Sequence, residues 1–151
     1  MQEFLDFITC NQAFNAAILS WFIAQVIKMI IAFVTKKTFD LRAFMDSGGM
    51  PSSHSSFVVA LALTIAFTDG VASTQFAISL ALACIVMYDA AGVRRAAGEQ
   101  AKAINKLMDT WENQEPDFVR MEIKEILGHT PIQVLAGAIL GAAIAVLLWF
   151  I

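Results

Sequence analysis

Charged residues are scarce in this chain, and their scarcity excludes an ordinary soluble domain. Only 15% of the 151 residues are charged, whereas 58% are hydrophobic. Soluble domains carry roughly 25% charged and about 45–50% apolar residues. A chain this short has no core large enough to hide so much apolar surface from water. We therefore expect lipid to surround most of the molecule.

Cysteine, histidine and net charge are equally limited, and each shortage excludes a class of protein. The two cysteines, Cys10 and Cys84, are isolated and predict neither a disulfide framework nor a zinc site. The two histidines and the scattered carboxylates lack the spacing of metal ligands, so we expect no metal and no cofactor. A net charge of −3 is too small to indicate a nucleic-acid partner.

Long apolar runs are what the sequence does contain. A spanning helix needs about 20 mostly apolar residues. Spans are expected at about 14–34, 51–68, 73–91 and 131–151. The apolar run within the second, at about residues 57–67, is short, and it reaches spanning length only if its helix begins near Pro51. The fold class expected is all-α: one integral membrane domain covering residues 1–151, with about four transmembrane helices.

The basic residues predict how this bundle is oriented. All of them except Lys28 fall in two loops, at about 35–50 and 92–130. Basic loops stay in the cytoplasm, so both loops are predicted to be cytoplasmic and both termini extracytoplasmic. Lys28, near the cytoplasmic end of the first span, is expected to extend its ammonium to the interface. We expect a multi-pass protein of the cell membrane.

The longer loop is predicted to contain two amphipathic helices. The stretch GVRRAAGEQAKAINKLMDTW, residues 92–111, continues out of the third span with charges at three- and four-residue steps on one face. A break around Pro116 separates it from a second short helix at residues 118–127. Pro131 then suits the first turn of the fourth span.

The stretch SGGMPSSHSS, residues 47–56, is an unusually polar entry into an apolar helix. Asp46 or Ser47 can cap that helix, and Pro51 suits its first turn. The two glycines allow the backbone to approach a ligand closely. These are Gly48 and Gly49.

A helix that begins in this stretch offers an anion-binding site. Its first N–H groups are free of helical partners, and the positive end of its dipole points the same way. Ser52, Ser53 and His54 would then lie beside the anion. The alternative is a serine-rich cap with a tolerated histidine at the interface.

The second histidine favours the anion site. His54 and His129 each lie within a few residues of the start of a span on the predicted cytoplasmic side. Two imidazoles with cations suit phosphoryl transfer, one attacking phosphorus and the other protonating the leaving oxygen. Basic residues at this interface are also what topology and anionic lipid require. The candidate cations are Lys36, Lys37, Arg42, Arg94 and Arg95.

Three blocks of sequence resemble one known superfamily. Pro51-Ser52-Ser53-His54 resembles the Pro-Ser-Gly-His signature of the type 2 phosphatidate phosphatase superfamily, which also contains vanadium haloperoxidases. GHTPIQVLAG, residues 128–137, resembles its last motif, where histidine opens the final core helix. SGGMPSSHS, YDAAGVRRAAGEQA and LGHTPIQVLAGAILG together resemble its small divergent branch, over nearly the whole chain from Lys36 onward.

The resemblance implies a metal-independent membrane phosphatase that acts on a lipid phosphate or diphosphate from the cytoplasmic side. It makes His129 the nucleophile and His54 the general acid. Phosphate-binding groups would come from the first polar stretch and from a loose match to a Lys-x6-Arg-Pro motif, in which Ala43 replaces the proline. These candidates are Gly49, Ser52, Ser53, Lys36, Lys37 and Arg42.

The last motif departs from the superfamily pattern. Its Ser-Arg pair is replaced by Glu122 and Ile123, and its aspartate by Gln133. An aspartate normally orients the attacking imidazole and stabilises its charge, whereas glutamine supplies no charge. We hypothesise that Asp89, at the membrane boundary, orients His129 and that Arg94 or Arg95 holds phosphate. The alternative is an ion pair between Asp89 and an arginine that anchors the helix end.

Two other function classes stay open. A non-catalytic protein that binds anionic lipid headgroups would explain the lost aspartate and arginine. A small helical bundle could instead serve as a structural partner subunit. Gly137 and Gly141 form a Gly-x-x-x-Gly that favours close helix packing, within the bundle rather than between subunits. The sequence leaves open whether the chain forms a homo-oligomer, and which lipid it would act on.

Overall fold

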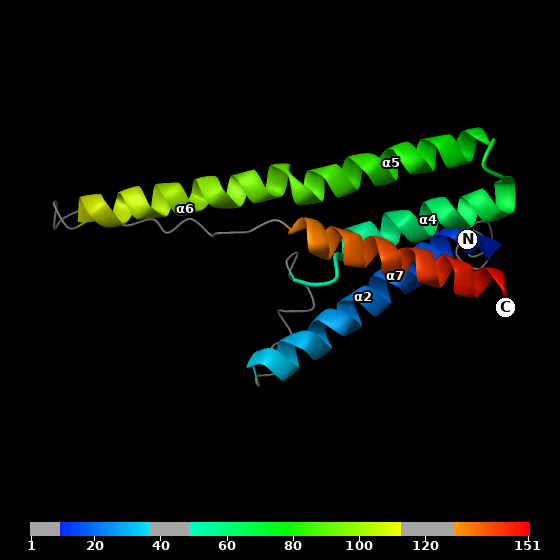
Figure 1. Ribbon diagram of the computed structural model, residues 1–151, viewed down its shortest axis with the longest axis horizontal. Coiled ribbons are helices and arrows are strands. Elements are labelled where there is room, and N and C mark those ends of the chain that lie inside the picture. The colour runs from blue at the N-terminus through cyan, green and yellow to red at the C-terminus, as the bar shows by residue number, and fades with distance from the viewer. Residues whose placement is uncertain (1–9, 37–48, 113–128) are drawn as a thin grey trace, which may run out of the picture.

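The computed structural model describes residues 10–36, 49–112 and 129–151. These ranges contain no strand, which confirms the all-α prediction for them. Their helices are α2 (Gln12–Lys36), α4 (Ser53–Asp69), α5 (Thr74–Ala91), α6 (Val93–Glu112) and α7 (Pro131–Trp149) (Figure 1). The predicted amphipathic helix at residues 118–127 lies outside the described residues.

Three of the described segments are long and apolar enough to cross a membrane. They are residues 12–35, 74–108 and 131–149, of which the second combines α5 with most of α6. The predicted spans at about 14–34, 73–91 and 131–151 fall on α2, α5 and α7. The segment predicted at 51–68 falls on α4, which is apolar but only 17 residues long. A fourth span therefore stays a prediction.

The helices alternate in direction, so their ends sort to two ends of the bundle (Figure 1). We call one the histidine end: the start of α4, the start of α7 and the end of α5 lie there. The beginning of α2, the end of α7 and the turn from α4 to α5 lie at the opposite end. α6 continues the line of α5 past the bundle (Figure 1).

Small residues allow α4 to pack closely against its neighbours. A Cβ added at Gly137 would clash with the carbonyl oxygen of Ser52, and one added at Gly141 would clash with that of Ser56. Glycine at both positions therefore lets the backbones of α7 and α4 touch. The Gly-x-x-x-Gly accordingly packs within the chain, as the sequence predicted. The facing residues of α2 are also small and fully buried: Ala16, Ser20 and Ala24.

The described part of the bundle buries small apolar and polar side chains together, and it exposes many of its large apolar ones. Its largest fully buried side chains are a histidine and serines: His129, Ser20, Ser52, Ser53, Ser55 and Ser56. Large apolar side chains such as Ile78, Ile85 and Ile139 are instead more than 60% exposed. Lipid tails cover such a surface without cost, which agrees with a membrane protein.

The start of α4 differs from the prediction. Asp46 or Ser47 was expected to cap this helix, but Ser52 does so, accepting a hydrogen bond from the Ser55 N–H at 3.3 Å. Pro51 therefore precedes the cap instead of lying in the first turn. The reason is tertiary: the Ser52 N–H donates to the Gln133 carbonyl at 3.0 Å, which fixes the chain beside α7 before the helix begins.

The start of α7 agrees with the prediction. Pro131 is the first helical residue, and Thr130 caps the helix through a capping box with Gln133. α6 also forms where the charge pattern predicted it. A break at Gly92 separates it from α5, although it keeps the line of that helix (Figure 1).

Candidate active site

His54 and His129 meet at the histidine end of the bundle. His54 is the second residue of α4 and half-buried, whereas His129 directly precedes the cap of α7 and is 2% exposed. Their ring centroids lie 6.2 Å apart, with ring planes inclined at 60°. His54 Nδ1 and His129 Nε2 are both buried. The fold therefore brings together the two side chains that the sequence paired.

His129 is held by two neighbouring helices. Its backbone N–H donates to the carbonyl of Ala90, at the end of α5, over 3.1 Å. Its Nδ1 lies 3.3 Å from Gln133 Oε1, one turn further along the chain. The same oxygen accepts from the Thr130 N–H at 3.0 Å, which fixes the orientation of the amide. An amide oxygen can only accept, so Nδ1 is the donor in this contact.

Gln133 thus occupies the place at Nδ1 for which Asp89 was predicted. The physical reason is proximity, because His129 directly precedes the cap of α7 and Gln133 lies in the first turn of that helix. Asp89 is half-buried near the end of α5, directly before the residue whose carbonyl binds the His129 backbone. It therefore belongs to the same end of the bundle. A catalytic role for Asp89 stays a prediction.

The serines at the start of α4 connect the helices. Ser52 Oγ accepts from both the N–H and the hydroxyl of Ser55, the latter at 3.0 Å. Ser20 Oγ donates to the Ser56 carbonyl at 3.2 Å and also contacts the Ser56 hydroxyl, which joins α2 to α4. Ser52 is therefore engaged within the protein. The role predicted for it in phosphate binding stays a prediction.

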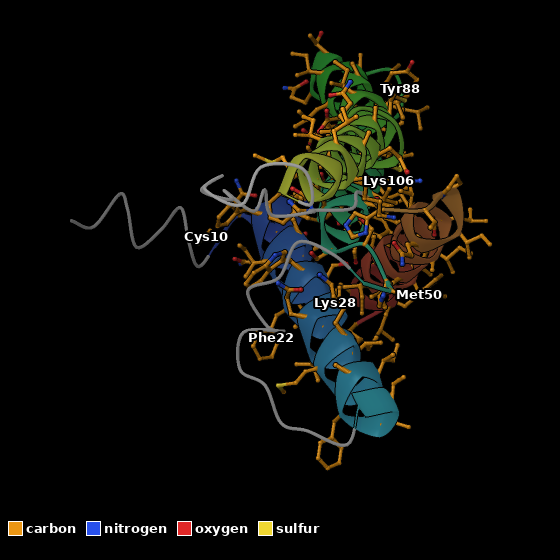
Figure 2. All side chains as sticks on the ribbon, turned by 90° about the vertical axis from the view of Figure 1, so that its left-hand side faces the viewer. Cys10, Phe22, Lys28, Met50, Tyr88 and Lys106 are labelled. Carbon is orange, nitrogen blue, oxygen red and sulfur yellow. The ribbon has the colours of Figure 1, made fainter. Side chains whose placement is uncertain are left out.

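Lys28 is the candidate that the sequence reasoning missed. The sequence allowed its ammonium to extend to the interface. In the structure the side chain is buried between helices, with 5% exposed, and its Nζ donates to Ser53 Oγ at 3.2 Å. Figure 2 labels it on α2. The available signal was that Lys28 is the one charge in the segment 14–34, and an ionisable residue within a span is a candidate functional residue.

Gly49 lies against the stem of this lysine. A Cβ added at Gly49 would stand 3.5 Å from Lys28 Cδ, and the backbone has a φ of +91°, which favours glycine. The polar stretch before α4 therefore packs on Lys28. Gly49 was predicted to bind phosphate. It lies beside the aliphatic part of the Lys28 side chain, and its role in phosphate binding stays a prediction.

The remaining predicted cations are described only in part. Lys37 and Arg42 lie outside the described residues. Lys36 is the last residue of α2, and Arg94 and Arg95 belong to the first turn of α6. The first turn of α6 adjoins the end of α5, and so lies at the histidine end. Phosphate binding by any of these five residues stays a prediction.

An apolar pocket of about 380 Å³ adjoins His54. It lies between α2, α4 and α5, and the imidazole is the one ionisable group among its walls. The lining residues are Ile18, Trp21, His54, Phe57, Val58 and Val86. The pocket therefore places an imidazole beside an otherwise apolar space, which suits hydrocarbon.

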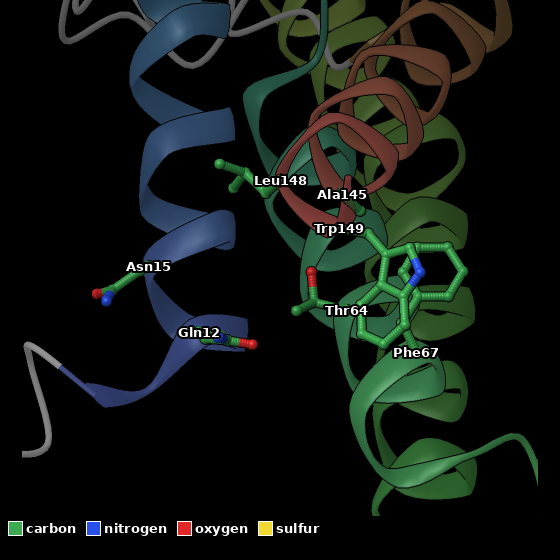
Figure 3. Close-up of a pocket in the computed structure, with 7 residues that line it drawn as sticks. All are labelled: Gln12, Asn15, Thr64, Phe67, Ala145, Leu148 and Trp149. Atoms are coloured by element: carbon green, nitrogen blue, oxygen red, sulfur yellow. The ribbon is translucent and has the colours of Figure 1, made fainter. Parts of the chain in front are cut away.

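A second pocket, of about 210 Å³, lies at the opposite end of the bundle (Figure 3). The rings of Phe67 and Trp149 stack across part of it with centroids 5.4 Å apart. Gln12, Asn15 and Thr64 supply its polar groups. Its lining residues include no imidazole and no charged side chain.

The sequence comparisons agree with the resemblance drawn from the motifs. Residues 9–144 match the model of the divergent PAP2 family. This chain belongs to that family. It is similar to the uncharacterized membrane protein YuiD of Bacillus subtilis (strain 168), with 42% identity over 135 residues, covering 83% of this chain and 85% of the relative. No solved structure matches it significantly.

The histidine end of this divergent PAP2 family member brings two imidazoles and an ammonium to one end of the bundle. They belong to His54, His129 and Lys28. Within residues 10–36, 49–112 and 129–151, no group of three or more His, Cys, Asp or Glu side chains is arranged to hold a metal ion.

Proposed function

We propose that this protein is a membrane phosphatase that hydrolyses a lipid phosphate or diphosphate, with His129 as nucleophile and His54 as general acid. The observation that carries the proposal is the imidazole pair at the histidine end, with centroids 6.2 Å apart. Each ring needs only about 3 Å from its nitrogen to an oxygen. One phosphoryl group between them is therefore within reach of both.

The chemistry proceeds in two steps that balance. In the first, the lone pair of His129 Nε2 forms a bond to phosphorus as the bond to the leaving oxygen breaks, and His54 donates its proton to that oxygen. In the second, His54 takes a proton from water, whose oxygen bonds to phosphorus. The nitrogen–phosphorus bond then breaks, which releases phosphate and restores His129.

Gln133 and the helix ends assist these steps. The Gln133 amide oxygen holds Nδ1 in its protonated form, which keeps Nε2 ready to attack. α4 and α7 both begin at this site, so their positive dipole ends face the phosphoryl oxygens. No step requires a divalent metal ion.

The apolar pocket at His54 supports a lipid as the substrate. A hydrocarbon chain can occupy the space between α2, α4 and α5 while its phosphate reaches the two histidines. Because the basic loops adjoin the histidine end, this end faces the cytoplasm and both termini lie outside. In this topology α4 is the fourth spanning helix.

The test is phosphate release by the purified protein in detergent, from a panel of single-chain and two-chain lipid phosphates and diphosphates. His129→Ala is the inactive variant, and Asp69→Asn, exposed at the opposite end, is the matched control. We expect release by the wild type and the control and none by His129→Ala. Release that persists in His129→Ala would overturn the assignment of the nucleophile.

A second function is favoured by one observation. The group at His129 Nδ1 is the neutral amide of Gln133, and a neutral partner does not stabilise an imidazolium as a carboxylate does. This neutral partner is consistent with a protein that binds anionic lipid headgroups and does not hydrolyse them. Binding of a lipid phosphate with no release from any member of the panel would establish this function in place of hydrolysis.

A further inference from the structure

A buried ammonium is the least expected group in this bundle. Lys28 lies on α2 about two turns before that helix ends, and only 5% of it is exposed. Placing an ammonium among packed helices costs free energy unless it meets acceptors or an opposite charge. Lipid-facing positions were available on the same helix, because Ile30 and Ile31 are largely exposed. The inward position of Lys28 therefore needs a reason.

The surroundings of Lys28 are adapted to negative charge. Its Nζ donates to Ser53 Oγ at 3.2 Å, and Ser53 is the first residue of α4. Since that hydroxyl oxygen accepts from Lys28, its own proton remains available for donation to an anion. The positive end of the α4 dipole lies at the same place. Ammonium, hydroxyl and helix end thus converge on one point.

A continuous set of contacts links this point to the histidines. Ser53 lies between Ser52 and His54 in the chain. The Ser52 N–H donates to the Gln133 carbonyl at 3.0 Å, and the Gln133 side chain contacts His129 Nδ1. The start of α4 is therefore fixed against the start of α7. Lys28 approaches the resulting site from α2, whereas His54 lies on α4 and His129 directly precedes the cap of α7.

We propose that Lys28 is a phosphate-binding residue, which donates from its ammonium to the phosphoryl oxygens together with the Ser53 hydroxyl. This assignment rests on the proposed function. It supplies a cation where the last motif lacks one, since Glu122 and Ile123 stand in the places of its Ser-Arg pair. The ammonium is preorganised, because its stem is packed against Gly49 and its tip is held at Ser53.

Lys28→Met tests the assignment, because methionine keeps an unbranched apolar side chain and removes the charge. Lys106→Met, at an exposed position on α6, is the matched control. Three quantities are measured for each purified protein: the Kd for inorganic phosphate by calorimetry, KM and kcat for a lipid phosphate, and the midpoint of thermal unfolding. Lys28→Arg, which keeps the charge, is the second variant.

We expect Lys28→Met to weaken phosphate binding and raise KM by about tenfold or more, since a charged hydrogen bond is lost. Lys28→Arg should restore part of both values. Lys106→Met should equal the wild type. A merely structural lysine would instead lower the unfolding midpoint without changing the phosphate Kd of the folded protein. Should Lys28→Met not fold, the same comparison is made between Lys28→Arg and Ser53→Ala, each of which should weaken phosphate binding.

The outcomes separate the two proposals. If the wild type releases phosphate and Lys28→Met matches it in Kd and KM, the assignment of Lys28 is overturned while the phosphatase stands. If the wild type binds phosphate in a Lys28-dependent way but releases none from lipids, the phosphatase is overturned and the anion site stands. If neither inorganic phosphate nor the lipid phosphate binds to the wild type, both are overturned.

Discussion

The two ends of the bundle both contain polar side chains, but in the described residues only the histidine end buries ionisable ones. At the histidine end His129 is 2% exposed and Lys28 is 5% exposed. At the opposite end Trp149 is 51% exposed, and Gln12 and Asn15 are exposed even though they line a pocket (Figure 3). A wet amide and an indole suit a membrane interface. At the histidine end an imidazole and an ammonium are buried instead, and ionisable groups within a membrane bundle are candidate functional residues.

The side chains beside the helix starts also differ between the two ends. α4 and α7 both start at the histidine end and both finish at the other. Positive dipole ends therefore meet where His54, His129 and Lys28 are placed, which favours an anion. At the opposite end the same two helices present carbonyl groups. α2 and α5 begin at the opposite end, so each end holds two helix starts, and the histidine end differs in the side chains beside its helix starts.

The largest expected effect is that of removing the nucleophile. His129→Asn keeps a side chain of similar length but has no nitrogen that can attack phosphorus. We expect kcat for phosphate release to fall by about 10⁴-fold or more, as for other residues that carry covalent chemistry. The measurement is the steady-state rate on the best lipid phosphate. Replacement of Gln12 by Ala, at the opposite end, should leave the rate within about twofold, in keeping with typical surface substitutions.

The group that orients His129 is decided by a second comparison. Because Gln133 Oε1 contacts Nδ1, Gln133→Ala should lower kcat by about 10- to 100-fold, as is usual when a supporting hydrogen bond is lost. Gln133→Glu adds the missing charge and should keep or raise kcat. Asp89→Asn is measured alongside them. A fall of about 10⁴-fold in Asp89→Asn, with Gln133→Ala close to wild type, would assign the orienting role to Asp89.

The close contact of α4 with α7 can be broken without touching the site chemistry. In Gly141→Ala the new Cβ clashes with the Ser56 carbonyl oxygen and crowds the Ala60 N–H. We expect a loss of about 1–3 kcal/mol in unfolding free energy from the forced separation. Ala143→Val on the exposed face of the same helix is the control. Equal unfolding free energies for the two variants would show that the helices separate without cost.

The smallest effect is expected from the aromatic pair at the opposite end. Trp149→Leu removes a ring that stacks on Phe67 with centroids 5.4 Å apart. Such pairs contribute about 0.5–1.5 kcal/mol, so the unfolding free energy should fall by about that amount. Phosphate release should not change. A large loss of turnover in this variant would remove the contrast between the two ends.

Much of this arrangement could be predicted from local sequence patterns. The apolar runs place α2, α5 and α7, the charge pattern places α6, and Thr130-Pro131 marks the start of α7. These features depend on neighbours within a turn or two, which composition and spacing record directly. The pairing of His54 with His129 also followed, because alternating helix directions bring two helix starts to one end.

Other features were decided only by contacts between distant segments. α4 is capped by Ser52 and not by the predicted Asp46 or Ser47, because the Ser52 N–H donates to the Gln133 carbonyl. That contact leaves no signal in the local pattern, since it depends on how closely the glycines of α7 let its backbone approach α4. The contact of Gln133 with His129 Nδ1 is local by comparison, because the two residues lie four apart in the chain.

By itself, the sequence determined a helical membrane protein with two histidines at one end of an apolar bundle, because helix length, hydropathy and motif spacing are properties of the chain. The tertiary structure decided where Lys28 goes. The sequence allowed an ammonium to extend to the interface, but the close packing of α2 on α4 turns it inward onto Ser53. A side chain near a helix end can point to water or to a neighbour, and only the packed helix beside it determines which direction costs less free energy.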